Sequence, residues 1–262
     1  MAQRRADRRR QQRRRQMAMV SVALVIALVG GVVLFSTFVV GGDDTPSPNP
    51  TTEPGTQTGT VDPEPGPSEV ACDADTPPGA LRPKPQFNAP AEVLQDDQSY
   101  TATLKTSCGD IVVRLLSDRA PETVNSFVFL AEQKYFDGTR IHRIDESIDV
   151  LQGGDPIGTG TSSPGYSIPD ELTGEETYPP GTLAMANSGP DTGGSQFFII
   201  TGEDGHNLDA NPNYTIFGRV IDGLDVAQEI QQIPVQDPGA GIEGQQPAQA
   251  VYVERVRIST KT

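Results

Sequence analysis

Hydrophobic and polar residues alternate with a period of two along several short segments of the chain, a pattern typical of half-buried β-strands. Residues 100–105 and 111–116 alternate in this way on either side of the polar turn 107–110, which predicts a β-hairpin. Further strands are predicted at residues 139–144, 148–152, 183–186, 196–200, 215–220 and 250–259. Glycine and proline punctuate the intervals between them, as expected for turns.

Two segments follow the helical period instead. The first begins at Pro121, which suits a first helical position, and its apolar stripe consists of Val124, Phe127, Val128 and Ala131. The second covers residues 224–232, with Leu224, Ala227 and Ile230 on one face. Eight short strands and two helices predict a mainly β fold, a closed eight-stranded antiparallel barrel capped by the two helices.

The first 40 residues have a different pattern. Residues 1–16 carry eight arginines and one aspartate, and residues 17–40 carry no charge and are rich in Val, Leu, Ile and Ala. About 20 apolar residues span a bilayer, so we expect a transmembrane helix at 17–40. A cleaved signal peptide fits less well, because its apolar region is about 7–15 residues long and ends at a small-residue cleavage motif. The arginines predict a cytoplasmic segment 1–16 and an extracytoplasmic C-terminal part in the cell membrane.

Residues 41–92 are rich in proline, threonine and glycine, a composition that predicts a disordered extracytoplasmic linker. The folded domain is expected at residues 93–262, but proline density stays high over residues 77–90, so the boundary can lie anywhere from about residue 70 to 93. Without residues 1–16, Lys plus Arg falls from 20 to 12 and Asp plus Glu from 35 to 34, so the remaining net charge is 12 − 34 = −22. This charge excludes nucleic acid and anionic lipid as expected partners of the exported part.

The chain has two cysteines and two histidines, which limits its cofactor chemistry. In an oxidising compartment Cys72 and Cys108 form a disulfide on one interpretation and remain independent thiols on the other. His142 and His206 are too few to suggest a zinc site, so no metal is expected.

The stretch LAMANSGPDTGGSQFFI, residues 183–199, sets the amide Gln196 beside Phe197 and Phe198. A hydrogen-bonding group next to an apolar surface suits a pocket for a peptide backbone and an apolar side chain. Because neighbouring strand residues face opposite ways, Phe197 is assigned to the core and Phe198 to the pocket.

Four segments in order carry a resemblance to a known family: His142-Arg143-Ile144, Leu151–Pro156, Met185-Ala186-Asn187 and Gly194–Phe198. Together they resemble the cyclophilin family of peptidyl-prolyl isomerases over about residues 99–258, and the layout of the whole chain resembles membrane-anchored actinobacterial cyclophilins. The resemblance implies an eight-stranded barrel and cis-trans isomerisation of X–Pro bonds without a cofactor. It also implies clients that are proline-containing polypeptides, here exported or cell-envelope proteins whose folding is assisted.

The resemblance also implies roles for individual residues. Arg143 would be the principal catalytic group, and Gln152 would hydrogen-bond the substrate backbone near it. His142 is more readily structural than a general base. The substrate-binding residues implied are Val150, Ala186, Asn187, Gln196, Phe198, Leu208 and Tyr214.

The chain departs from the family pattern in the segment 145–150, where the usual Pro-Gly-Phe is absent and one extra residue separates Arg143 from Gln152. Ile148 fills the place of the missing aromatic if the extra residue forms a bulge, whereas counting back from Gln152 places Asp149 there. Asn207 replaces a common aromatic, which predicts weakened cyclosporin binding. A proline-peptide-binding module or chaperone with little catalysis is therefore the alternative function, and a structural envelope protein is a third.

Overall fold

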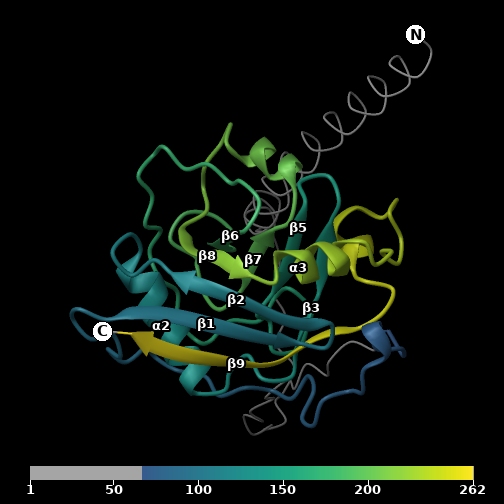
Figure 1. The fold of residues 1–262 in the computed structure, drawn as a ribbon, viewed down its shortest axis with the longest axis horizontal. Helices are drawn as coiled ribbons and strands as arrows, with labels where there is room; N and C mark the ends of the chain where they lie inside the picture. Colours follow the sequence, from purple (N-terminus) through teal and green to yellow (C-terminus); the bar gives the residue numbers. More distant parts are fainter. Residues whose placement is uncertain (1–66, 262) are drawn as a thin grey trace, which may run out of the picture.

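Nine antiparallel strands form one sheet that curls into a nearly closed barrel in the computed structural model, which describes residues 67–261 (Figure 1). The strand order is β3-β9-β1-β2-β8-β6-β7-β5-β4. The strands are β1 Ser99–Thr106, β2 Gly109–Leu115, β3 Thr139–Ile141, β4 Arg143–Asp145, β5 Val150–Gly153, β6 Thr182–Met185, β7 Phe197–Ile200, β8 Ile216–Asp222 and β9 Val251–Lys261.

The two strands at the ends of this order, β3 and β4, follow one another in the chain and are separated only by His142. The N–H of His142 donates to the carbonyl of Gln152 on β5 at 3.0 Å, so the chain bends across the gap and nearly closes the barrel. The expectation of eight strands is corrected to nine, because the predicted strand 139–144 divides at His142. The mainly β, antiparallel barrel architecture is confirmed.

Two α-helices pack on the barrel, as the helical periodicity predicts. Helix α2, Pro121–Glu132, has its proline in the first turn and packs against β9. Helix α3, Leu224–Gln231, packs against β2 and β5. Three short 3-10 helices complete the described part: η1 Ala71–Asp73, η2 Glu203–Leu208 and η3 Gly241–Gln245.

An aromatic cluster fills the space between α2 and the barrel. The ring of Phe127 on α2 lies 4.9 Å from Phe136, 5.8 Å from Phe197 and 5.3 Å from Phe217, measured between ring centroids. Each of these four rings is at most 1% exposed. Burying whole aromatic side chains contributes strongly to folding, so this cluster anchors the helix to the sheet.

Residues 67–92, expected in the linker, pack against the barrel instead. Ala71 is buried and donates its N–H to the carbonyl of Ala250 at 2.9 Å, and the ring of Phe87 lies edge-on to Phe129 at 5.0 Å. Cys72 and Cys108 form a disulfide, which decides between the two interpretations of the cysteines. The folded part therefore begins before residue 93.

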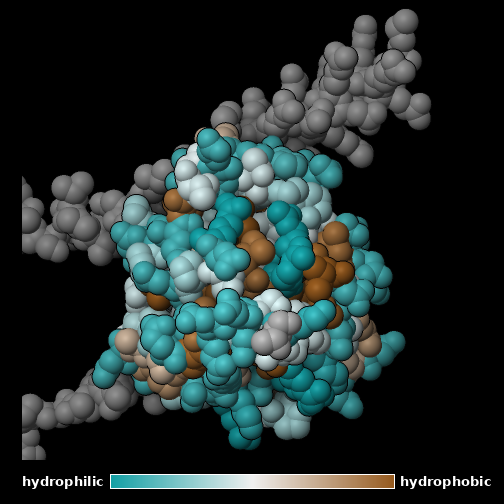
Figure 2. All heavy atoms as spheres, turned by 60° about the vertical axis from the view of Figure 1, so that its left-hand side comes forward, coloured by the Kyte–Doolittle hydropathy of each residue, from teal (hydrophilic) through white to brown (hydrophobic). Residues whose placement is uncertain are grey.

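The expected cytoplasmic segment 1–16, the transmembrane helix 17–40 and the linker up to residue 66 lie outside the described residues. Among residues 67–261, no helix combines the length and apolar character needed to cross a membrane. The face drawn in Figure 2 is mostly hydrophilic, and apolar atoms gather in hollows between the hydrophilic side chains.

Candidate functional site

A second apolar cluster lies on the opposite face of the sheet from the aromatic core. On β7, Phe197 and Ile199 belong to the core, whereas Phe198 and Ile200 belong to this second cluster. The division follows from the strand, because successive side chains point to opposite faces. The other members are Val150, Tyr178, Ala184, Leu208 and Ile216, with Leu116, Ile148, Ala186 and Tyr214 partly buried against them.

The structure thus brings together the apolar residues predicted to bind a proline ring. Phe198, Val150, Leu208, Tyr214 and Ile148 all belong to the second cluster, although they come from separate elements. The ring of Phe198 meets that of Tyr214 edge-on at 5.1 Å and 89°. Phe197 is fully buried, as predicted for a core residue.

Arg143 opens β4 and is paired in register with Gln152 on β5. Its guanidinium donates three hydrogen bonds: from Nε to Gln245 Oε1 at 2.7 Å, from Nη1 to Gln152 Oε1 at 3.0 Å, and from Nη2 to Asp145 Oδ2 at 2.5 Å. The arginine side chain remains 21% exposed. It is therefore held from three sides without being removed from solvent.

Two amides extend this network across the sheet. Gln152 Nε2 donates to Gln196 Oε1 at 3.0 Å, and Gln196 Nε2 donates to the carbonyl of Gly160 at 2.9 Å. Because a guanidinium only donates, Gln152 must turn its oxygen to Arg143 and its nitrogen to Gln196. The predicted site residues Arg143, Gln152 and Gln196 are thus in one hydrogen-bonded row.

The turn between β4 and β5 decides which residue takes the place of the missing aromatic. Asp149 has a left-handed backbone with φ of 50°, and its Oδ2 accepts the N–H of Asp204 at 2.8 Å. This directs Asp149 toward η2, while Ile148 packs against the apolar cluster. The extra residue is absorbed in the turn, and of the two interpretations the structure selects Ile148.

Asp145 and Gln245 are two contacts of Arg143 that the sequence patterns did not reveal. Asp145 lies two positions after Arg143 on the same strand, and its side chain therefore shares the arginine's face. That spacing was a signal that could have predicted the ion pair. Gln245 is 102 positions from Arg143 on η3, and no local pattern pointed to it.

Ala186 and Asn187 follow β6 beside the amide row. The N–H of Ala186 donates to the carbonyl of Gln196 at 2.9 Å, and the Asn187 side chain donates to the carbonyl of Asn213 at 2.8 Å. Within residues 67–261, no hydrogen bond is recorded for the backbone N–H and C=O of Asn187. A fixed residue with free backbone groups can pair with an extended peptide in the manner of a β-strand.

Two ionisable groups near Arg143 remain neutral around pH 7. Burial raises the pKa of Tyr214 above its ordinary value, and Asp145 also raises it while Arg143 lowers it. Burial lowers the pKa of His142 to about 4, with Arg143 and Arg140 also lowering it and Asp155 opposing them. The charge at the site is therefore that of the Arg143–Asp145 pair.

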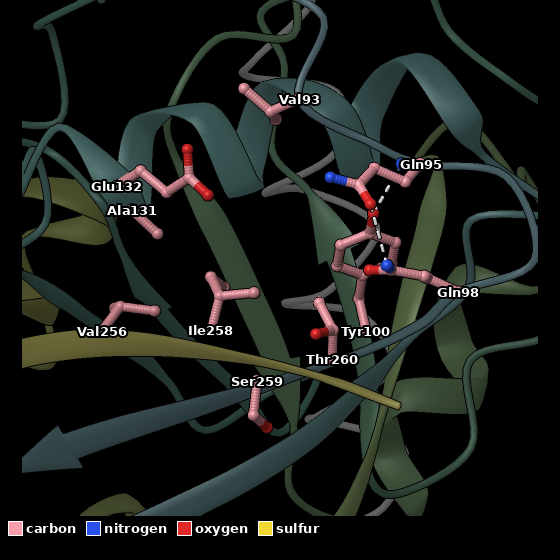
Figure 3. A pocket seen from close by; sticks show the side chains of 10 residues that line it. All are labelled: Val93, Gln95, Gln98, Tyr100, Ala131, Glu132, Val256, Ile258, Ser259 and Thr260. Atoms are coloured by element: carbon pink, nitrogen blue, oxygen red, sulfur yellow. Dashed lines mark hydrogen bonds between the residues drawn. The ribbon is translucent and has the colours of Figure 1, made fainter. Parts of the chain in front are cut away.

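A separate cavity of about 470 Å³ lies away from this site, between the end of α2, β9 and residues 93–98 (Figure 3). Its lining includes Val93, Tyr100, Glu132 and Ile258, and Figure 3 shows the Glu132 carboxylate over the β9 side chains. None of its lining residues belongs to the second apolar cluster or contacts Arg143.

Asn207 is exposed and donates to the carbonyl of Ser147 at 3.3 Å, so it contacts the turn outside the apolar cluster.

Comparison with known proteins decides the family of this arrangement. The sequence profile described as "Cyclophilin type peptidyl-prolyl cis-trans isomerase/CLD" matches residues 101–258. The chain belongs to this family. The match covers every strand from β2 to β8 and both α-helices, so the cyclophilin resemblance seen in the sequence is confirmed.

Among similar cyclophilins, the "Peptidyl-prolyl cis-trans isomerase A" of Mycobacterium tuberculosis is 39% identical over 176 residues, covering 61% of this chain and 92% of the relative. The "Probable peptidyl-prolyl cis-trans isomerase B" of the same organism is 37% identical over 182 residues, covering 64% of this chain but only 57% of the relative. A crystal structure of a Cryptosporidium parvum cyclophilin superposes with a TM-score of 0.55 at 29% identity, covering 63% of this chain and 99% of that one. A further crystal structure of that protein was determined in the presence of the dipeptide Ala-Pro.

Proposed function

We propose that this cyclophilin catalyses cis-trans isomerisation of X–Pro peptide bonds. The observation that carries the proposal is a guanidinium held by three side chains and placed near Tyr214 of the second apolar cluster. No nucleophile is required for this reaction, because no covalent bond is broken. Catalysis needs only a group that binds the twisted amide better than either planar form.

The peptide bond resists rotation because resonance gives it partial double-bond character. An uncatalysed X–Pro bond therefore isomerises in tens to hundreds of seconds. When the bond is twisted, the prolyl nitrogen regains a lone pair that accepts a hydrogen bond. Arg143 can donate an N–H to that nitrogen in the twisted state, and this stabilisation is absent from both planar states.

The remaining contacts position the substrate. The second apolar cluster, with Phe198 at its centre, would receive the proline ring, and the backbone of Asn187 would pair with the peptide strand. Gln152 lies between Arg143 and Gln196, where it can hold the arginine and meet the substrate backbone. The proline then rests against a fixed surface while the bond before it rotates beside Arg143, so that proximity contributes to the rate.

The proposal is tested with the full chain, purified in mild detergent, and a proline-containing peptide followed by NMR exchange spectroscopy. We expect exchange between the cis and trans signals to be accelerated by catalytic amounts of protein. Exchange at the uncatalysed rate despite peptide binding would instead support the alternative, a binding module of the same fold. The altered turn 146–149 favours that alternative, because Ile148 supplies less surface than an aromatic ring.

A membrane tether and a role in folding exported or cell-envelope proteins extend this proposal. It is supported by the apolar segment 17–40 behind eight arginines and by the Cys72–Cys108 disulfide, a bond that persists mainly in oxidising compartments. Expressed in a bacterial host, the chain should resist carbonate extraction from membranes, and protease added to spheroplasts should degrade its C-terminal part. Recovery in the soluble fraction would refute the tether and leave the enzymatic proposal intact.

A further inference from the structure

We propose that Asp145 is a positioning residue, which fixes the guanidinium of Arg143 and joins it to the turn that carries Ile148. This inference rests on the proposed function, in which Arg143 acts on the substrate. It assigns a purpose to the segment where the chain departs from the family pattern. The two oxygens of this one buried carboxylate reach in different directions.

The first oxygen holds the arginine. Asp145 Oδ2 accepts a hydrogen bond from Arg143 Nη2, and the Asp145 side chain is only 2% exposed. Charge-assisted bonds of this kind are roughly twice as strong as neutral ones, so Asp145 is a firmer partner than Gln152 or Gln245. Together the three partners occupy three of the five N–H groups of the guanidinium. One N–H on each terminal nitrogen is left to point toward a substrate.

The second oxygen holds the turn. Asp145 Oδ1 accepts the backbone N–H of Ser147 at 2.9 Å and its hydroxyl at 2.6 Å. Ser147 directly precedes Ile148, the side chain that packs against the apolar cluster in place of an aromatic. Asp145 thus sets the distance between the arginine and the wall of the proline site. Both must be correctly placed for the twisted bond to meet Arg143.

An amide cannot replace this carboxylate without loss. Asparagine at position 145 has one accepting oxygen, and its NH₂ group would face either the donor of Ser147 or the donor of Arg143. Asp145→Asn therefore breaks one of the two connections while it preserves the side-chain volume. The adjacent Glu146 is exposed and makes no hydrogen bond or ion pair with any of residues 67–261, so Glu146→Gln removes the same charge from the same turn without touching the arginine.

The kinetic test compares the full chain, Asp145→Asn and Glu146→Gln with one proline-containing peptide. We expect Asp145→Asn to lower kcat by about tenfold or more with KM changed less than about threefold, since a misplaced catalytic group costs mainly transition-state binding. Glu146→Gln should match the unchanged protein. Equal losses in the two variants, a loss confined to KM, or an unchanged kcat in Asp145→Asn would each overturn the proposal.

A spectroscopic test does not depend on catalysis. In ¹⁵N-arginine-labelled protein, the Arg143 side-chain signals are assigned by their disappearance in Arg143→Lys. A clamped guanidinium should give separate Nη signals from slow rotation about the Nε–Cζ bond, and in Asp145→Asn these signals should merge. Merged signals in the unchanged protein would refute the clamp. An unchanged protein with separate signals but no isomerase activity would refute the proposed function and uphold the clamp.

Discussion

Replacing Arg143 with alanine should destabilise the fold as well as remove activity. The substitution leaves the Asp145 carboxylate, whose side chain is 2% exposed, without its cationic partner. Breaking a buried ion pair in this way typically costs about 3–5 kcal/mol. Two bonds from Ser147 remain, and water can enter the space of a side chain that was 21% exposed. We therefore expect a loss of about 2–3 kcal/mol in the free energy of unfolding, below that range.

Urea denaturation followed by far-UV circular dichroism measures this loss, and the same change should lower Tm by roughly 4–12 °C. The double variant Arg143→Ala with Asp145→Asn removes the stranded charge and should be more stable than Arg143→Ala alone. In the unchanged background, Asp145→Asn should be destabilising, so the sign of its effect reverses. Arg114→Ala, at an exposed position of β2, is the matched control. Equal stability of Arg143→Ala and Arg114→Ala would show that Arg143 does not stabilise the buried Asp145 carboxylate.

Three further outcomes are expected. Cys72→Ser with Cys108→Ser should lower the free energy of unfolding, measured by urea titration, by about 3–4 kcal/mol, because the disulfide closes a loop with a sequence separation of 36. An unchanged free energy of unfolding would show that the bond does not constrain the unfolded chain. The pKa of His142 is about 4 in the folded chain and 6.5 when unperturbed, so between these pH values only the unfolded chain binds the proton, and the free energy of unfolding falls as the pH drops from 6.5 to 4. In His142→Phe this fall should be smaller by up to about 3 kcal/mol. A dependence of stability on pH that is the same in His142→Phe and in the unchanged chain would contradict this. Ile148→Ala should reduce kcat/KM by roughly 5–30-fold, because it removes apolar contact area from the proline site. Ile221→Ala, at a 53% exposed position, should leave kcat/KM unchanged. Equal effects of the two substitutions would show that Ile148 does not contact the proline.

The barrel could be predicted from the sequence where its strands have one buried and one solvated face. Strand β1 alternates between buried and partly exposed residues, and its predicted range lies within one residue of the observed one at either end. The division of the predicted strand at His142 could not be predicted, because residues 139–145 are almost all buried and therefore show no alternation of buried and exposed positions. Where both faces are covered, periodicity no longer marks where a strand bends.

The beginning of the folded part could be placed from the sequence only within about residues 70–93, for a different reason. Residues 67–92 are rich in proline and poor in large apolar residues, which suggested a linker. Their order comes from contacts with distant parts of the chain: the disulfide to Cys108, the pairing of Ala71 with Ala250 and the packing of Phe87 on Phe129. Composition indicates whether a segment can form a hydrophobic core of its own. It does not predict order in a segment that packs against a core formed by other parts of the chain.

The candidate site also contains residues that could be predicted from the sequence and residues that could not. Arg143, Gln152, Gln196 and Phe198 were identified because their order along the chain resembles the cyclophilin pattern, and the structure brings them together. The choice between Ile148 and Asp149 required the left-handed backbone of Asp149, which counting cannot supply. Of the other partners of the arginine, Asp145 shares its strand face at a spacing of two, whereas Gln245 lies 102 positions away and is brought to Arg143 only by the folded arrangement.

The catalytic role of Arg143 is tested most directly by the catalytic rate of Arg143→Lys relative to the unchanged full chain, measured by NMR exchange on a proline-containing peptide. Lysine keeps the positive charge beside Asp145, so the buried carboxylate keeps a partner, but a compact ammonium cannot make the three-sided contact of a guanidinium. We expect rapid catalysed exchange in the unchanged chain and about a hundredfold lower kcat in Arg143→Lys, with peptide binding retained. Catalysis by Arg143→Lys at the rate of the unchanged chain would contradict this expectation.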